Sequence, residues 1–496
     1  MRVLAVVAAS WPAVFLPTLA EAHGFDERYD LPAPLSYFVV GASLTVALTF
    51  VAAAVFARRA PDSHAQDVDA AAKLIAYGPW LPALQLGCRI SAFALFGVVL
   101  GAALWGTADP MMNLAPTLVW IIWWIGFSLL VACVGNPWPV IDPWRTLFDA
   151  FDALAQRLGR QDGIALGWVW PRALGAWPAV ALLLAWSWLE VVYPLAAVPF
   201  RLGCAMLLWS VLTLTGMLCF GREAWQRNAD VFAIYFDTLG RMAPLANGQR
   251  GRNIALRAPG AALINVDSAA PAGVTGFIIA MLATVLFDGL HGGQAWLLLE
   301  ALLKRTVPQW MDLNGYFAGT VGLVGVWLLF FCAYQLTCLV TARVTGATFT
   351  TSSVHAAQIA RRFAPTLVPI AVAYIIAHNF SSLLIQGQNA IALLSDPFGR
   401  RWDLFGTANR HVNIGIIDAQ WTWYVAVAAI VGGHVLAVWL AHRVALRDCA
   451  TPRRAALASL PLTLLMVVYT AISLSVIAEP MVTFEGPRAD PVPVAR

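Results

Sequence analysis

Ten stretches of about twenty mostly apolar residues follow one another along the chain, and they constrain its fold more than any other feature. A helix needs about twenty apolar residues to cross the hydrocarbon core of a bilayer, where every backbone polar group must be paired inside the protein. We therefore predict an all-α, polytopic helical membrane protein with about ten transmembrane helices. The predicted spans are Leu35–Phe56, Ile90–Gly106, Leu114–Val134, Leu174–Val192, Leu202–Phe220, Val274–Leu290, Phe317–Val340, Pro365–Leu384, Trp421–Leu440 and Leu457–Ile477.

The composition supports this class and excludes several others. Hydrophobic residues make up 60% of the chain and charged residues only 12%, about half the usual charged share. So few charges cannot cover a soluble surface, which excludes a soluble enzyme, a disordered chain and a fibrous protein. The net charge of +4 does not indicate nucleic-acid binding. The expected partner is the lipid bilayer.

The N-terminus has the pattern of a secretory signal. Arg2 precedes an apolar run that ends in Ala20-Glu21-Ala22. A basic start, a short apolar core and an A-x-A site predict a cleavable signal peptide over residues 1–22. The alternative is an uncleaved first helix. We assign residues 23–484 to the helical transmembrane domain, and the Pro-rich, polar residues 485–496 to a disordered tail.

The basic residues predict the orientation in the membrane. With residue 23 outside, the cytoplasmic loops carry 21 of the 31 Lys and Arg residues, and the opposite loops carry 9. Cytoplasmic loops are enriched in Lys and Arg. We therefore expect a multi-pass protein of the bacterial inner membrane with both mature termini in the periplasm.

Tryptophans and prolines mark the ends of several spans. Trp138, Trp144 and Trp296 are among those near predicted helix ends, which favours an interfacial aromatic belt. The pair Asp142-Pro143 predicts the cap of an amphipathic helix over Trp144–Leu158. The outer segment 386–418 is long for a simple connection, and long loops are often functional.

Ionisable residues in or near spans are the first candidates for function, because their burial in lipid is costly. Asp288 and His291 lie at the outer end of the sixth span, His378 lies in the eighth, His434 in the ninth, and Glu190 at the outer end of the fourth. The alternative for each is a hydrogen bond between helices.

Three further candidates lie on the outer side. His23 would begin the mature chain, where its amine and its ring can both bind one metal ion, and Asp403 and His411 lie in the long outer loop. Imidazole suits Cu and Zn, and a metal-bound water is an effective nucleophile. We predict a divalent metal, Cu or Zn, and an outward-facing site. The predicted metal ligands are His23, His291, His378 and His434, and the predicted catalytic residues are Asp288, Asp403 and His411.

Three segments resemble those of a known family. They are His23-Gly24-Phe25-Asp26, Gly135-Asn136-Pro137-Trp138 followed by Asp142-Pro143-Trp144-Arg145, and His378-Asn379-Phe380 with Gln386-Gly387-Gln388. The chain resembles, over most of its length, bacterial polytopic membrane proteins labelled fenitrothion hydrolase. The resemblance implies hydrolysis of aryl phosphotriesters on the periplasmic side. No catalytic residues carry over from it.

The resulting hypothesis is a membrane-integrated hydrolase of phosphotriesters or similar small hydrophobic esters, assisted by a metal-bound hydroxide. One alternative is a transporter, or an accessory subunit that binds a membrane partner without catalysis. The other is an electron-transfer protein that holds haem or copper. Against haem, His378 and His434 differ by about 8 Å in predicted depth, whereas axial ligands lie at nearly equal depth.

Overall fold

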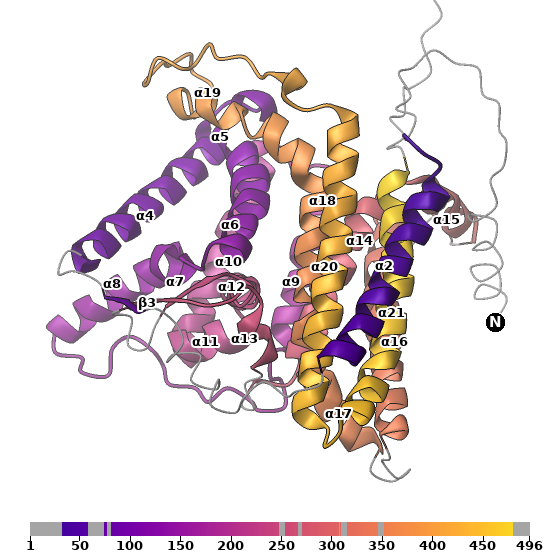
Figure 1. The fold of residues 1–496 in the computed structure, drawn as a ribbon. Coiled ribbons are helices and arrows are strands. Elements are labelled where there is room, and N and C mark those ends of the chain that lie inside the picture. Colours follow the sequence, from indigo (N-terminus) through magenta and orange to yellow (C-terminus); the bar gives the residue numbers. More distant parts are fainter. Residues whose placement is uncertain are drawn as a thin grey trace, which may run out of the picture.

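The computed structural model describes residues 32–57, 74–76, 81–247, 253–265, 270–306, 308, 315–345 and 352–479. Helices dominate these residues, as the hydropathy predicts (Figure 1). The predicted signal peptide, His23 and the predicted tail lie outside the described residues.

Nine helical stretches among the described residues are long and apolar enough to cross a membrane. They are Leu35–Phe56 (α2), Leu81–Trp105 (α4), Leu114–Cys133, Pro199–Phe220 (α10), Val274–His291 (α14), Phe317–Val344 (α16), His355–Gln386, Ala419–Asp448 (α20) and Pro452–Ala478 (α21). The stretch predicted as the fourth span forms a shorter helix, α9 (Trp177–Val191), of 15 residues. At 1.5 Å per residue α9 is about 22 Å long. The all-α polytopic fold is thus confirmed, with α9 shorter than a full span.

Two of the spanning stretches are composite. Leu114–Cys133 consists of α5 (Leu114–Pro116), the π-helix η3 (Thr117–Phe127) and α6 (Ser128–Cys133). His355–Gln386 includes most of α17 (Ser352–Phe363), the 3₁₀ turn η6 (Ala364–Leu367) and α18 (Val368–Gln386).

Short elements lie at the two ends of the bundle. One end holds η2 (Pro110–Met112), α15 (Gln294–Thr306), α19 (Asn389–Ser395) and η7 (Ile414–Ile416). The opposite end holds α7 (Trp138–Ile141), α8 (Pro143–Arg157), α11 (Arg222–Asn228), α12 (Val231–Gly240) and α13 (Ala261–Ile264). Figure 1 shows α5 and α19 at the first end and α11, α13 and α17 at the second.

A small antiparallel sheet also lies at the second end. Its strands are β1 (Leu74–Ala76), β2 (Leu245–Asn247) and β3 (Asn253–Leu256), in the order β1-β3-β2. Leu74 pairs with Ala255, and Leu245 pairs with Leu256. The sheet joins two connections that are far apart in the sequence.

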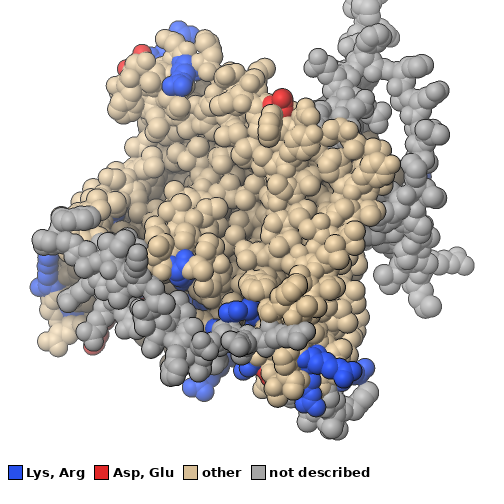
Figure 2. Space-filling view, viewed as in Figure 1, with Lys and Arg blue, Asp and Glu red and all other residues tan. Residues whose placement is uncertain are grey.

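Basic residues collect at this second end. Figure 2 shows most Lys and Arg of the viewed face there, with a few more at the tip of the opposite end. We call it the basic end, and the opposite one, which the sequence predicts to face outward, the outer end.

The cap predicted at the start of the amphipathic helix is present. The Asp142 side chain accepts hydrogen bonds from the backbone N–H groups of Trp144 and Arg145, and α8 begins at Pro143. A carboxylate at this position satisfies N–H groups that have no partner inside the helix.

The aromatic belt prediction is wrong for several tryptophans. Trp138 and Trp144 are 4% and 7% exposed and belong to a buried aromatic cluster. Trp144 stacks on Phe232 with 5.8 Å between ring centroids. Trp296, also predicted near an interface, is buried against Phe287. Position near a helix end does not decide whether a ring faces lipid or a neighbouring helix, because that depends on how the helices pack.

Candidate functional site

A carboxylate and an imidazole from two different spans form a pair near the outer end. His378 Nε2 on α18 lies 3.1 Å from Asp288 Oδ2 on α14. The two side chains are 15% and 33% exposed. Because a carboxylate only accepts hydrogen bonds when ionised, Nε2 is the donor, and Nδ1 is the nitrogen that can accept a proton. Two of the predicted site residues therefore meet.

The pair lies beside a small polar pocket. Asp288 and Asn379 line it together with Glu190 from α9, Trp124 from η3, and Tyr235 from α12. Its volume is about 30 Å³, which is room for about one water molecule. Glu190 Oε2 accepts a hydrogen bond of 2.9 Å from Trp124 Nε1. Two carboxylates, Asp288 and Glu190, thus border a space of molecular-water size, and the His378 imidazole contacts Asp288 without lining that space itself.

Glu190 and Trp124 are missing from the predicted site. The signal for Glu190 is that it is an ionisable residue in an apolar segment. Trp124 carries no comparable signal, because it is one of three tryptophans within a single apolar stretch.

A much larger apolar chamber lies next to this pocket. Its volume is about 560 Å³, within the range of about 300–1,000 Å³ typical of small-molecule sites. Side chains of α4, η3, α9, α10 and α12 form most of its wall, including Trp123, Trp186 and Phe232. Leu95 and Leu208, which also line it, are 40% and 72% exposed, so the chamber has lipid-facing walls.

Tryptophan rings separate the pocket from the chamber. Trp124 lines the pocket and Trp186 lines the chamber, and their ring centroids are 5.4 Å apart. Trp123, the neighbour of Trp124, faces the chamber. Both come from η3, whose π-helical winding extends over 11 residues. Long π-helical segments are rare, and shorter ones occur frequently at functional sites.

His291 is near the pair in sequence but packs differently. Its ring lies 5.5 Å from the rings of both Phe287 and Trp296. Asp288 therefore pairs with His378 of another helix rather than with the residue three positions away on its own.

His434 lies elsewhere in the bundle. It is 1% exposed, and its Nδ1 is 2.8 Å from the carbonyl oxygen of Ile430. Its ring lies 5.7 Å from that of Tyr469. Because the carbonyl accepts, Nδ1 donates and Nε2 is left as an acceptor, which has no hydrogen-bond partner among the described residues.

Asp403 and His411 belong to the exposed outer loop. Asp403 Oδ1 accepts a hydrogen bond from the Ala408 backbone N–H at 3.0 Å. The loop is fixed to the turn between α18 and α19 by two 3.1 Å hydrogen bonds: Gln388 Nε2 donates to the Asn413 carbonyl oxygen, and the Asn413 backbone N–H donates to Gln388 Oε1. Neither Asp403 nor His411 is among the residues that line the pocket or the chamber.

The predicted metal ligands do not form one cluster in the part of the chain that the structure describes. Within those residues, no three His, Cys, Asp or Glu side chains are placed to hold a metal ion. His23 is not among them, so the metal site stays a prediction.

Comparison of the chain with protein-family models, with curated proteins and with solved structures found no match.

Proposed function

We propose that the protein is a membrane-embedded hydrolase of small lipophilic esters, of the aryl phosphotriester class that the sequence resemblance implies. One observation carries the proposal. The Asp288–His378 pair borders a polar pocket with Glu190, on the far side of Trp124 from a large apolar chamber. An acid–base group and an apolar binding space of ligand size are thus next to each other.

In this mechanism His378 is the general base. Asp288 holds the imidazole through Nε2, so Nδ1 takes a proton from a water molecule, and Asp288 stabilises the imidazolium that forms. The water oxygen bonds to phosphorus, and the bond from phosphorus to the aryl oxygen breaks. Glu190, in its protonated form, gives its proton to the aryl oxide, and the His378 proton then restores Glu190 through solvent.

The chamber accounts for the preference for lipophilic substrates. Its wall is almost entirely apolar, and exposed Leu95 and Leu208 allow entry from the bilayer. Because the pocket holds only a water-sized volume, the reacting ester has to reach past the ring of Trp124. Trp124 is therefore the residue that sets access to the base.

The proposed location is the bacterial inner membrane, with both mature termini in the periplasm. The nine apolar helices and the collection of Lys and Arg at one end support it. With the basic end in the cytoplasm, the Asp288–His378 pair lies toward the periplasm.

The test is hydrolysis by purified protein in detergent, without any ion gradient, with fenitrothion as substrate and nitrophenol release as the readout. We expect turnover by the wild type and by His355→Ala, whose side chain is exposed and distant in the sequence from the pocket. We expect its loss in His378→Ala. Absence of turnover in the wild type, or equal rates in both variants, would contradict the proposal.

A proton-coupled transporter is the second candidate, and a set of buried polar side chains on two packed helices favours it. His434, His442, Ser459, Thr463 and Ser473 are all 3% exposed or less, on the packed helices α20 and α21. His442 Nδ1 lies 3.3 Å from Ser459 Oγ near the basic end. Chains of such groups are used as proton relays in membrane proteins. A transporter moves substrate only in sealed vesicles and releases no product in detergent.

A further inference from the structure

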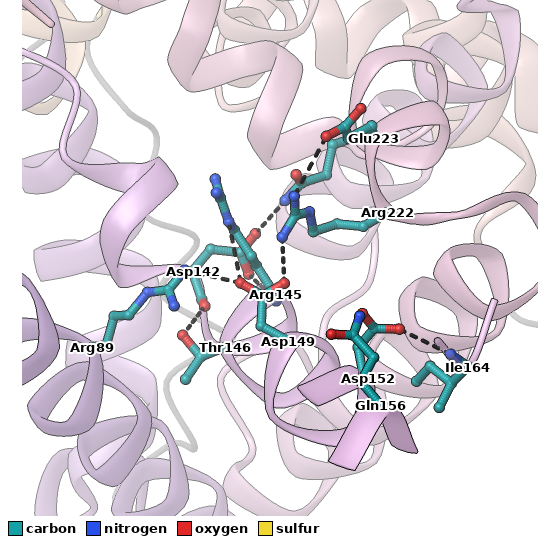
Figure 3. A network of polar contacts seen from close by, with 11 residues as sticks. Arg89, Asp142, Arg145, Thr146, Asp149, Asp152, Gln156, Ile164, Arg222 and Glu223 are labelled. Carbon is teal, nitrogen blue, oxygen red and sulfur yellow. Dashed lines mark hydrogen bonds and ion pairs between the residues drawn. The ribbon is translucent and has the colours of Figure 1, made fainter. Parts of the chain in front are cut away.

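Three arginines from three helices surround one carboxylate at the basic end (Figure 3). Arg89 Nη2 of α4 lies 3.0 Å from Asp149 Oδ2, and Arg222 Nη1 of α11 binds Asp149 Oδ1. Arg145 Nε of α8 lies 3.8 Å from Asp149 Oδ2, which is too far for a hydrogen bond. The three arginine side chains are about a quarter exposed. We call Arg89, Arg145, Arg222 and Asp149 the arginine cluster.

The arginine cluster has more positive than negative charge. Asp149 supplies one carboxylate for three guanidinium groups. The oxygens of Asp142, the next carboxylate, accept hydrogen bonds from backbone N–H groups and from Gln226 Nε2. Glu223, 3.6 Å from Arg222, is 91% exposed, so water screens it strongly.

Arg145 shows the consequence of this imbalance. Its Nε is buried and has no hydrogen-bond partner among the residues that the structure describes. Burial and the neighbouring Arg222 charge lower the pKa of Arg145. The guanidinium therefore lies where an additional anion is favourable.

The arginine cluster stands at the level of lipid headgroups. Helix α8, which carries Arg145 and Asp149, exposes Phe151, Leu154 and Leu158 on one side. Trp144 and Phe148 lie on the same apolar face, nearer the start of the helix, and are buried in the protein. A helix with this pattern lies in the plane of the membrane surface, with its exposed apolar side chains in the lipid.

The arginine cluster also adjoins the apolar chamber. Ala92, one turn after Arg89 on α4, lines the chamber, and so does Trp144, the residue before Arg145. No arginine among the described residues lines the chamber itself, but the arginine cluster lies directly beside it, so we treat the two as one amphipathic space, with positive charge at the basic end and apolar walls along its side.

We propose that this space binds one anionic phospholipid, with its phosphate on Arg89, Arg145 and Arg222 and one acyl chain in the chamber. Guanidinium groups match phosphate through paired hydrogen bonds. The cytoplasmic leaflet, where the positive-inside rule places the basic end, is rich in anionic lipids. The inference rests on the arginine cluster and not on the proposed hydrolase activity. Because an acyl chain shares the chamber with the proposed substrate, bound lipid competes with substrate.

The test is binding of phosphatidylglycerol and of phosphatidylcholine to the purified full chain in detergent, measured by native mass spectrometry and by the lipid-induced shift in Tm. We expect preference for phosphatidylglycerol, and a loss of about five-fold in its affinity in Arg89→Gln. Arg222→Gln is the second variant and has the same expected effect. Arg241→Gln is the matched control, because Arg241, which directly follows α12, pairs with Asp237 of that helix and is not part of the cluster.

Asp149→Asn separates a binding role from a structural one. Removing the internal anion frees three guanidinium groups, so we expect tighter binding of phosphatidylglycerol. A merely structural cluster predicts lower stability in this variant and no gain in lipid affinity. Any one of three results would overturn the proposal. The first is this structural outcome for Asp149→Asn, and the second is equal binding of the two lipids by the wild type. The third is equal affinity for phosphatidylglycerol in Arg89→Gln and Arg241→Gln.

Two further measurements distinguish binding of a lipid from binding of a free phosphate ion. Ala205 lines the chamber, so Ala205→Phe reduces its volume without touching the arginines. We expect this variant to lose affinity for phosphatidylglycerol and to keep any affinity for inorganic phosphate. If inorganic phosphate binds as tightly as phosphatidylglycerol, and Ala205→Phe does not change the affinity for phosphatidylglycerol, the site binds a free anion. That result would overturn the proposal of a bound lipid.

Discussion

His378 Nε2 and Asp288 Oδ2, on helices α18 and α14, are 3.1 Å apart and close a polar contact between two membrane-spanning segments. The contact fixes the orientation of the imidazole and leaves Nδ1 to accept a proton.

Removing either member of the pair should abolish most of the proposed activity. Without His378 no base takes the proton from water, and without the Asp288 charge the imidazolium loses its stabilising partner. General-base catalysis contributes about 10²- to 10⁴-fold, so we expect kcat to fall by that range in His378→Ala and less in Asp288→Asn. Steady-state kinetics in detergent measures both. Full kcat in His378→Ala means that another group acts as the base.

Narrowing the chamber should weaken substrate binding and leave the chemistry intact. Ala185 lines the chamber on α9, so Ala185→Phe removes volume that an aromatic substrate needs. We expect KM to rise several-fold with kcat nearly unchanged. The control is Ala181→Phe, one turn earlier on α9 and not part of the chamber wall. A rise in KM in both variants alike would show that the chamber does not bind substrate.

Gly216 should not tolerate a side chain. A Cβ at Gly216 would lie 2.1 Å from Cε3 of Trp225, a buried ring that cannot move aside easily. Overpacking of this kind costs about 1–3 kcal/mol, so we expect Gly216→Ala to lower Tm. A Cβ at Gly432 meets nothing within 4 Å, so Gly432→Ala should leave Tm unchanged or raise it slightly. Thermal unfolding in detergent compares the two.

Stability should fall as pH rises from about 4 to about 7 because of two buried carboxyls at the basic end. Burial raises the pKa of Asp142 to about 6. Burial, and to a lesser extent the Asp142 charge, raise the pKa of Asp230 to about 7. In this window the folded state binds more protons than the unfolded state, so raising the pH lowers the free energy of unfolding, and the loss levels off about one pH unit above the pKa of Asp230.

Asp230→Asn should flatten this pH dependence. Asp230 Oδ2 has no hydrogen-bond partner among the described residues, so an amide at this position loses no bond there. The Oδ1 atom keeps its bond from the Ala233 backbone N–H. Chemical unfolding of both proteins between pH 4 and 8 measures the difference, and a steeper slope in the variant would contradict the assignment.

The sequence alone was sufficient to predict the helices and to identify the individual ionisable residues within them. Hydropathy over about twenty residues locates the spans, because the cost of an unpaired backbone in lipid acts on each segment separately. Asp142 and Pro143 predict the start of α8, because capping is settled by neighbouring residues. The ionisable residues in apolar segments, Asp288 and His378 among them, are visible without any structure.

Only the tertiary structure decided which of these groups meet. Asp288 pairs with His378 and not with His291, because the rotation and depth of α14 against α18 fix that contact, and neither is encoded in local hydropathy. The burial of Trp138 and Trp144 and the chamber that their helices enclose depend on the same packing. Apolar side chains satisfy lipid and protein neighbours almost equally well, so the sequence places a helix in the membrane without determining which of its faces meets another helix.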